Sequence, residues 1–279
     1  MTRTWLITGA SRGFGRHLAE AVLERGDHVL ATARRPEHLA DLVSRHAARV
    51  RTAALDVTDA DAARAAVDGA VTAFGRLDVV VNNAGYANSG PIEDMTDEDF
   101  REQFETNFFG VVNVTRAALP VLRAQRSGVF VQFSSLGGRV GGTPGMGAYQ
   151  SAKFAVEGFS EVLAGEVAPF GVKVVIVEPG AFRTDWQGSS MELHAVRPDY
   201  EETVGAMNRY RRENDGAQPG DPARAARVII EVVGHDDPPR RLLLGAQAVT
   251  AALAAGEARA AETRRWAGAS AAADFPAER

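Results

Sequence analysis

A tyrosine and a lysine stand one helical turn apart in the stretch Tyr149-Gln150-Ser151-Ala152-Lys153. If this stretch is helical, residues at i and i+4 share a face, so the phenol and the ammonium point the same way. A free tyrosine titrates near pH ~10 and is a poor acid or base at neutrality. A cation beside it would stabilise the phenolate and lower its pKa, so that proton exchange with a substrate oxygen becomes efficient. The pair alone is weak evidence, because this spacing also arises by chance on solvated helices.

A glycine-rich turn lies near the start of the chain. The apolar run Trp5-Leu6-Ile7-Thr8 reads as a buried strand and leads into Gly9-Ala10-Ser11-Arg12-Gly13-Phe14-Gly15, after which apolar residues follow at helical spacing. Glycines let a backbone approach a pyrophosphate closely, and the free N–H groups of a helix start stabilise its charge. The spacing G-x-x-x-G-x-G in this context predicts a dinucleotide site, whereas the alternative is a glycine-rich connection that serves only packing.

The second predicted strand, residues 28–33, ends in Ala33-Arg34-Arg35. About 20 residues after such a glycine turn, sites that prefer NAD tend to carry an Asp or Glu for the ribose 2′-hydroxyl. Arginines stand here instead, and a guanidinium suits a 2′-phosphate because it is planar, always charged and bidentate. Arg12 could approach the same phosphate. The pattern favours NADP(H) over NAD(H), while the alternative is a pair of solvated arginines.

The elements that must position these residues alternate along the chain. Apolar runs at residues 50–55, 77–81, 129–133, 172–177 and 242–245 read as further strands, separated by helical segments such as 59–74 and 97–126. We expect Pro120 to bend or divide the second of these. The helix that carries Tyr149 has an apolar face formed by Ala152, Ala155, Val156, Phe159, Val162 and Leu163. This alternation predicts the α/β class: one domain over residues 1–266, a three-layer, doubly wound parallel sheet of the Rossmann type.

The polar and glycine-rich stretches gather where the predicted strands end: residues 9–15, Arg34, Asp56, the run Asn82-Asn83-Ala84-Gly85, Ser135 and residues 179–184. In an open parallel sheet, ligands bind beyond the carboxyl ends of the strands. We therefore expect one shared site at this edge.

Composition limits the classes of partner and compartment. The chain has 279 residues and a net charge of −5, which disfavours a nucleic-acid surface. It contains no cysteine, so a disulfide or a thiolate site is excluded, and its six histidines show no metal-ligand spacing. The amino terminus leaves no room for a signal peptide, and no apolar run is long enough to span a bilayer. We expect a cytoplasmic protein without membrane or nucleic-acid partners.

Taken together, these motifs resemble the short-chain dehydrogenase/reductase family in its compact, single-domain form, over roughly residues 4–185. The set that carries the resemblance is Thr8-Gly9-x-x-x-Gly13-x-Gly15, Asp56, Asn82-Asn83-Ala84-Gly85, Asn107, Ser135, Tyr149-x-x-x-Lys153, and Pro179-Gly180 with Thr184. The surroundings of Ser135 and Tyr149 look most like bacterial hydroxysteroid and retinol dehydrogenases.

The resemblance implies a catalytic set. Tyr149 would be the general acid/base, Lys153 would lower its pKa and bind the nicotinamide ribose, and Ser135 would hydrogen-bond the reacting oxygen. Asn107 would hold a water beside Lys153, and Ser134 would be structural. The implied cofactor-binding residues are Gly9, Ser11, Arg12, Gly13, Phe14, Gly15, Arg34, Asp56, Val57, Asn83, Ala84, Gly85, Tyr149, Lys153, Pro179, Gly180 and Thr184.

The strand–helix rhythm stops over residues 182–222, where family members place a mobile segment that covers the substrate. Apolar side chains here, such as Trp186 and Met191, hint at a hydrophobic carbonyl or alcohol substrate, although most of them could simply pack on the core. We expect residues 246–266 to be helical and residues 267–279 to form a flexible tail. The family is usually oligomeric, so we expect a homo-oligomer, dimer or tetramer.

Three functions fit a chain of this kind. The first is an NADP(H)-dependent oxidoreductase that interconverts a ketone or aldehyde with its alcohol. The second is a catalytically silent nucleotide sensor on the same fold. It is disfavoured because Ser135, Tyr149, Lys153 and Asn107 are all present. The third is an epimerase or dehydratase on a related fold, which tends to be longer and to have another glycine spacing.

Overall fold

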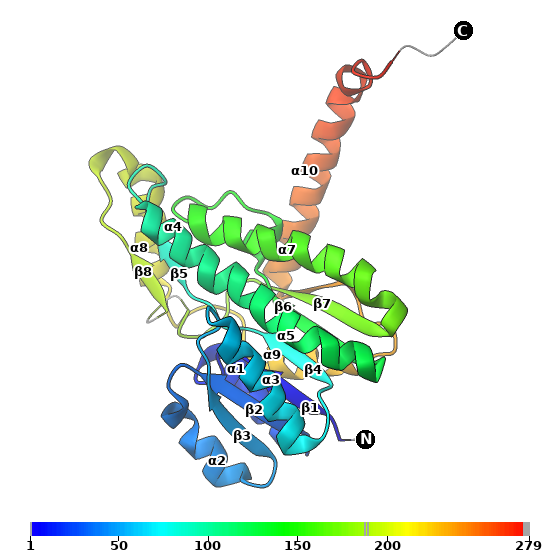
Figure 1. Ribbon diagram of the computed structural model, residues 1–279. Helices are drawn as coiled ribbons and strands as arrows, with labels where there is room; N and C mark the ends of the chain where they lie inside the picture. Colours follow the sequence, from blue (N-terminus) through cyan, green and yellow to red (C-terminus); the bar gives the residue numbers. More distant parts are fainter. Residues whose placement is uncertain (1, 187, 189, 276–279) are drawn as a thin grey trace.

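Seven parallel strands form the central sheet of the computed structural model, which describes residues 2–186, 188 and 190–275 (Figure 1). The strands are β1 (Thr4–Ile7), β2 (His28–Ala33), β3 (Val50–Ala54), β4 (Val79–Asn82), β6 (Gly128–Phe133), β7 (Val172–Pro179) and β9 (Arg241–Leu244). Their order is β3-β2-β1-β4-β6-β7-β9, so the chain winds outward in both directions from the pair β1 and β4. The predicted doubly wound parallel sheet is confirmed, with strand ends shifted by a residue or two.

Two apolar cores lie on opposite faces of the sheet, because successive side chains of a strand point to opposite sides. Trp5 and Ile7 pack into one core and Leu6 into the other. The first core is covered by α1 (Gly13–Glu24), α2 (Ala40–His46) and α9 (Pro222–Gly234), and the second by α3 (Ala60–Phe74), α5 (Gly110–Gln125) and α7 (Gly147–Val167). Burial on both faces explains why the strands are continuous apolar runs.

The predicted long helix over residues 97–126 is divided, but not at Pro120. It consists of α4 (Asp97–Phe104), a π-helical turn η2 (Glu105–Phe109) and α5. Pro120 lies inside α5, where the buried Ala118 and Leu122 hold the helix to the sheet on both sides of it. A division at Pro120 is therefore wrong, because packing outweighs the one hydrogen bond that a proline removes, whereas a bend at Pro120 stays a prediction.

Helix α7 also differs from its predicted pattern at one position. Val162, placed on the apolar face by the sequence, is 62% exposed. The buried stripe of α7 runs through Ala152, Val156, Ser160, Leu163 and Val167 instead, and Val162 lies about 100° around the helix from Leu163.

A small second sheet joins the segment after β4 to the predicted substrate-covering segment. Strand β5 (Ala87–Ser89) pairs in parallel with β8 (Met191–Leu193), which is followed by η4 (Pro198–Tyr200), the π-helical η5 (Glu201–Gly205) and α8 (Ala206–Glu213). This pairing brings residues 190–213 beside the end of β4. Two positions of the predicted segment, Gln187 and Ser189, lie outside the described residues, as does Met1.

The last helix, α10 (Ala246–Ala271), projects from the body of the molecule (Figure 1). Ala248 and Ala252 in its first turns are buried, whereas the residues after Gly256 are exposed. The predicted tail thus begins inside this helix, and residues 276–279 lie outside the described part of the chain. Across the described residues, none of the helices combines the length and apolar character needed to cross a membrane.

The contact between the glycine turn and α1 gives a test of this architecture. A Cβ at Gly15 would lie 2.4 Å from Gly9 O and 2.5 Å from Asn83 Nδ2, whereas nothing lies within 4 Å of a Cβ at Gly69 in α3. We expect Gly15→Ala to lower the free energy of unfolding by about 1–3 kcal/mol. Gly69→Ala, the matched control, should raise it by up to about 1 kcal/mol. Urea unfolding measures both, and equal stability of the two variants would contradict the close contact at Gly15.

Candidate functional site

A cavity of about 270 Å³ opens at the carboxyl ends of the strands. Its lining comes from the turns after β1, β2, β3, β4 and β6, together with η2, α7 and the segment after β7. It includes these residues predicted from the sequence: Gly9, Ser11, Arg12, Gly13, Phe14, Arg34, Asp56, Val57, Asn83, Ala84, Gly85, Asn107, Ser135, Tyr149, Lys153, Pro179, Gly180 and Thr184. The expectation of one shared site at this edge agrees with this placement.

Gly15 is the predicted cofactor-binding residue that does not line the cavity. It is buried beneath the turn, where its missing side chain lets α1 approach Gly9 O and the amide of Asn83. The absence of a side chain serves helix-to-turn packing, and the assignment of Gly15 to cofactor binding stays a prediction.

The glycine turn has the shape of an anion cradle. Gly9 and Gly13 have φ values of +65° and +55°, which side chains with a Cβ rarely adopt, and a Cβ at Gly9 would lie 2.9 Å from the Cα of Ala84. Helix α1 begins at Gly13 without an acidic residue in its first turn and without a side-chain cap from the described residues. Its first N–H groups therefore face the cavity as donors, which suits a pyrophosphate.

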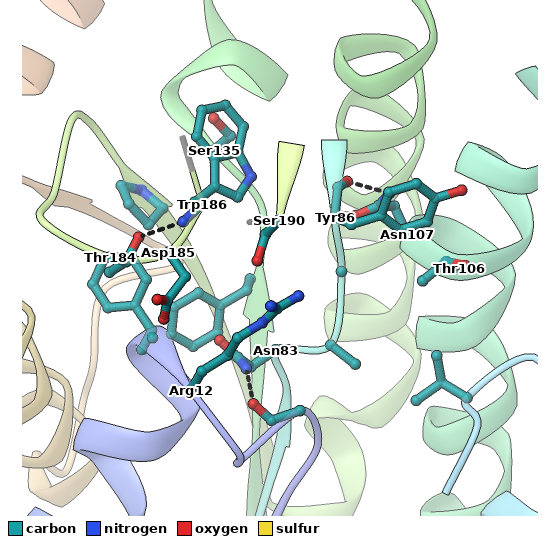
Figure 2. A pocket seen from close by; sticks show the side chains of 18 of the residues that line it. Arg12, Asn83, Tyr86, Thr106, Asn107, Ser135, Thr184, Asp185, Trp186 and Ser190 are labelled. Atoms are coloured by element: carbon teal, nitrogen blue, oxygen red, sulfur yellow. Dashed lines mark hydrogen bonds between the residues drawn. The ribbon is translucent and has the colours of Figure 1, made fainter. Parts of the chain in front are cut away.

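Thr8 and Asn83 hold this turn against the end of β4. Thr8 Oγ1 donates to Val81 O at 3.1 Å and accepts from the backbone N–H groups of Asn83 and Ala84, each at 3.0 Å. The Asn83 amide donates to Thr8 O at 2.9 Å and to Gly9 O at 3.2 Å. Asn83 thus braces the backbone of the glycine turn, and Figure 2 shows it near Arg12.

The end of the cavity formed by the turns after β2 and β3 has apolar walls, an arginine and a carboxylate. Ala33 and Leu55 form the walls, Arg34 is exposed at the rim, and Asp56 is the acidic residue there. Asp56 Oδ1 accepts from Thr58 N at 3.0 Å and from Thr58 Oγ1 at 2.8 Å, which fixes its direction. Arg35 does not line the cavity.

Tyr149 and Ser135 meet at the other end. Tyr149 is 6% exposed, and burial raises the pKa of its phenol to about 12, while a hydrogen bond from Ser135 acts in the opposite direction. Ser135 is the N-cap of the short helix α6 (Leu136–Arg139), and its Oγ accepts from Gly137 N at 3.0 Å. That bond uses one of the two lone pairs of the hydroxyl oxygen, and the O–H proton stays available for donation into the cavity.

Lys153 lies below the phenol and is 4% exposed. Its Nζ donates to Phe133 O at 2.9 Å and lies 5.8 Å from the centroid of the Tyr149 ring. Burial lowers the pKa of Lys153 to about 8, against the opposing effect of Glu157. The sequence predicted that this cation lowers the pKa of Tyr149. In the structure burial of the phenol dominates the pKa of Tyr149, and the effect of Lys153 on it stays a prediction.

Asn107 lies fully buried in the π-helical turn η2. Its Nδ2 donates to Tyr86 O at 3.0 Å (Figure 2) and to Gln103 Oε1 at 3.1 Å. Its Oδ1 is buried and has no partner among the described residues. A Cβ built on Gly85 would lie 2.5 Å from this oxygen and 3.7 Å from Lys153 Nζ, so both atoms border the same point. A buried carbonyl of this kind fits a bound donor.

Aromatic side chains close the cavity around Tyr149. The Trp186 ring lies 5.3 Å from the Tyr149 ring, and Thr184 Oγ1 accepts from Trp186 N at 3.4 Å (Figure 2). Phe14 in the glycine turn packs against Phe182, with centroids 5.0 Å apart. Sequence reasoning missed several lining residues: Leu55, Tyr86, Thr106, Asp185 and Ser190. Some of these residues could have been predicted because they stand next to a motif: Leu55 precedes Asp56, and Tyr86 follows Gly85.

Comparison with known proteins adds to this geometry. The model of the short chain dehydrogenase family matches residues 3–194. Oxidoreductase BOA17 of Botryotinia fuckeliana is 50% identical over 267 residues, which is 95% of this chain and 97% of the relative. A 3-ketodihydrosphingosine reductase of Bacteroides thetaiotaomicron is 39% identical over 244 residues, 86% of this chain and 87% of the relative.

Solved structures agree. The crystal structure of a short-chain dehydrogenase from Streptomyces avermitilis superposes with a TM-score of 0.92 at 42% identity, covering 99% of this chain and all of that one. ElxO with NADP bound gives 0.72 at 28% identity, over 87% and 96% of the two chains. A chain from Burkholderia phymatum in complex with NAD gives 0.76 at 24% identity, over 87% and 88%, and supports the fold alone.

The raised pKa of Tyr149 gives a direct test of the site. The 13Cζ NMR signal of Tyr149, assigned with Tyr149→Phe, should remain at its phenol position up to pH ~10.5, above the usual midpoint near ~10. Ser135→Ala should move the midpoint further upward, because the hydrogen bond that it removes lowers the pKa of Tyr149. A midpoint below pH ~9 in the cofactor-free protein would contradict the dominance of burial.

Proposed function

This chain belongs to the short chain dehydrogenase family and is an oxidoreductase that uses a nicotinamide cofactor; from that premise we propose that it interconverts a hydrophobic ketone or aldehyde and its alcohol with NADP(H). The observation that carries the proposal is the meeting of Ser135, Tyr149 and Lys153 at one end of a cavity whose other end is a glycine cradle with an arginine. A proton donor beside a nucleotide cradle suits redox chemistry at a carbonyl.

The proposed mechanism assigns a task to each side chain. In the reducing direction, Tyr149 Oη gives its proton to the carbonyl oxygen, and Ser135 Oγ donates a hydrogen bond to that oxygen as it becomes negative. Lys153 returns a proton to Tyr149, and a donor held by Asn107 Oδ1 beside Lys153 completes the relay. The nicotinamide ring, when bound, supplies or accepts the hydride. The pKa of Tyr149, raised to about 12, keeps the phenol protonated at neutral pH, as proton donation requires.

Preference for NADP(H) rests on charge at the end of β2. Arg34 lines the cavity directly after Ala33, at the place where a carboxylate would accept from the ribose 2′-hydroxyl of NAD. A guanidinium there favours a 2′-phosphate. The NADP bound to ElxO is consistent with this preference.

A hydrophobic substrate is supported by the surfaces around Tyr149. Ala87, Met146 and Tyr149 form an apolar cluster, against which Trp186 and Met191 pack. An apolar wall beside one hydroxyl pair suits a carbonyl on an aliphatic or ring system. The Bacteroides thetaiotaomicron relative is named as a reductase of a 3-keto compound, which agrees with a ketone.

The homo-oligomeric state, the cytoplasmic location and the substrate-covering role of residues 182–222 stay predictions. Exposed apolar side chains on η2 and α7 support an association surface: Phe109 is 44% exposed, Phe154 42% and Val162 62%. Light scattering at working concentration measures the oligomeric state.

Tyr149→Phe tests the catalytic assignment, since the phenyl ring keeps the shape and removes only the proton-transferring oxygen. We expect kcat to fall by roughly 10²- to 10⁴-fold across a panel of ketones, aldehydes and secondary alcohols, with NADPH binding retained. Absorbance of NADPH and a binding titration provide the two readouts. Equal turnover by wild type and variant would refute the mechanism. Silence of the wild type with every substrate, while NADPH still binds, would favour the nucleotide-sensor alternative.

Arg34 and Arg35 form a matched pair for cofactor choice. Arg34→Ala should raise KM for NADPH roughly ten- to a hundredfold, because a charge-assisted contact is worth ~1.5–3 kcal/mol, and should leave KM for NADH nearly unchanged. Arg35→Ala removes the same charge outside the cavity and should change neither value by more than about twofold. A similar rise in both variants would point to a general field effect, and no change in either would remove Arg34 from the site.

A further inference from the structure

The direction of one buried amide decides which atom Asn107 presents to Lys153. We propose that Gln103 is a positioning residue that sets this direction, an inference that rests on the proposed function. Gln103 belongs to α4, one turn before Asn107, and is fully buried. Its Oε1 accepts from Asn107 Nδ2 at 3.1 Å.

An asparagine amide can be turned about its last bond, which exchanges its oxygen and nitrogen. In the observed orientation Nδ2 donates to two acceptors, Tyr86 O and Gln103 Oε1. The turned orientation would place Oδ1 against both of these oxygens, leaving two acceptors without a donor and two oxygens in repulsion. The two acceptors together therefore direct Oδ1 away from themselves.

The direction they impose is towards the catalytic end of the cavity. Oδ1 and Lys153 Nζ border the same point, which a Cβ on Gly85 would occupy at 2.5 Å and 3.7 Å respectively. Oδ1 has no partner among the described residues, and a buried carbonyl needs one. A carbonyl at that point can accept from a water or from the ammonium, whereas an amide N–H₂ facing an ammonium would oppose donor to donor.

The two acceptors differ in what holds them. Tyr86 O is a backbone acceptor directly after the Asn83-Ala84-Gly85 run, so it stays whichever side chain stands at position 86. The acceptor of Gln103 is a side-chain oxygen, so it is lost when this residue is substituted. Burying a glutamine is costly unless its polar atoms are used. Gln103 Oε1 is used by Asn107, whereas Gln103 Nε2 is buried and has no hydrogen-bond partner among the described residues. Burial raises the pKa of Tyr86, and the Gln103 amide works against that rise.

The π-helical turn explains why a residue one turn away can serve in this way. In η2 the Gly110 N–H reaches back to Glu105 O, so the turn holds one residue more than an α-helical turn. Asn107 lies in this turn with its Oδ1 next to Gly85, and Gln103 lies four positions earlier, near the end of α4. The geometry thus requires a side chain long enough to reach down from α4, with an acceptor at its end.

Gln103→Leu keeps the volume and removes the acceptor, whereas Gln103→Glu keeps an acceptor in the same place. We expect Gln103→Leu to lower kcat roughly fivefold to thirtyfold with KM for NADPH within about twofold of wild type, and to share the altered pH profile of kcat of Asn107→Ala. Gln103→Glu should recover most of kcat. Because Gln103 acts through Asn107, the double variant Gln103→Leu/Asn107→Ala should be no slower than Asn107→Ala alone.

Thr115→Val is the matched control. It removes another buried polar group of this helical region, the acceptor for Asn82 at 3.1 Å and Gln132 at 3.2 Å, without touching Asn107. It should lower the melting temperature as Gln103→Leu does, yet leave the pH profile of kcat unchanged. The same change of profile in Thr115→Val would overturn the proposal, as would wild-type kcat and profile in Gln103→Leu, or additive losses in the double variant.

The Asn107→Ala variant distinguishes a failure of the proposed function from a failure of the positioning role of Gln103. Wild-type kcat in Asn107→Ala would remove Asn107 from the catalytic set, and the role of Gln103 would fall with it. Loss in Asn107→Ala without loss in Gln103→Leu would refute the positioning role alone.

Discussion

A lysine ammonium buried beneath a tyrosine is the constraint on which the rest of the site depends. Removal from water disfavours the charged form, and burial lowers the pKa of Lys153 to about 8. The charge is retained at neutral pH because Nζ donates to Phe133 O, at the end of β6, and because Glu157 lies one turn further along α7. The sheet edge and the helix must therefore stay in register. Gly138 allows this, since a Cβ there would lie 2.9 Å from the Cβ of Lys153.

One helical turn after Lys153 in α7, Glu157 belongs to a group of charged residues that joins α7 to β7 and β9. Arg241 of β9 bridges Glu157 and Glu178 at 3.1 and 3.2 Å, and Arg139 of α6 reaches Glu178 at 3.2 Å. Glu178 immediately precedes Pro179 and is fully buried. Burial and the neighbouring Glu157 raise its pKa to about 7, against the pull of the two arginines. Two buried carboxylates are stable here because they share arginine cations. These ion pairs hold α6, α7, β7 and β9 together, and the loss of either arginine would leave a buried carboxylate with fewer cationic partners.

The sequence predicted most of the fold and the membership of the site, for a physical reason. Strands buried on both faces are continuous apolar runs, and ligand-binding side chains of a parallel sheet gather at its carboxyl edge, so local patterns carried both. Local patterns could not predict the features that depend on packing between distant segments of the chain. The π-helical turn at Asn107 replaces the expected break at Pro120, Gly15 serves contact with Gly9 rather than the cavity, and Gln103 gains its meaning only from Tyr86 and Asn107. The pattern of one helix gave no sign of these contacts.

The same reason explains why the raised pKa of Tyr149 could not be predicted from the spacing of Tyr149 and Lys153. The spacing of the pair is local, but the desolvation of the phenol is produced by Trp186, Met146 and the small second sheet, which come from other parts of the chain. Closing this apolar wall protects the site from water and at the same time raises the cost of the phenolate, so a protonated phenol is the resting form. The hydrogen bond from Ser135 stabilises the phenolate and so lowers the pKa of Tyr149, against the effect of burial. In the proposed mechanism, a phenol enclosed in this way keeps its proton until a substrate oxygen that develops charge accepts it.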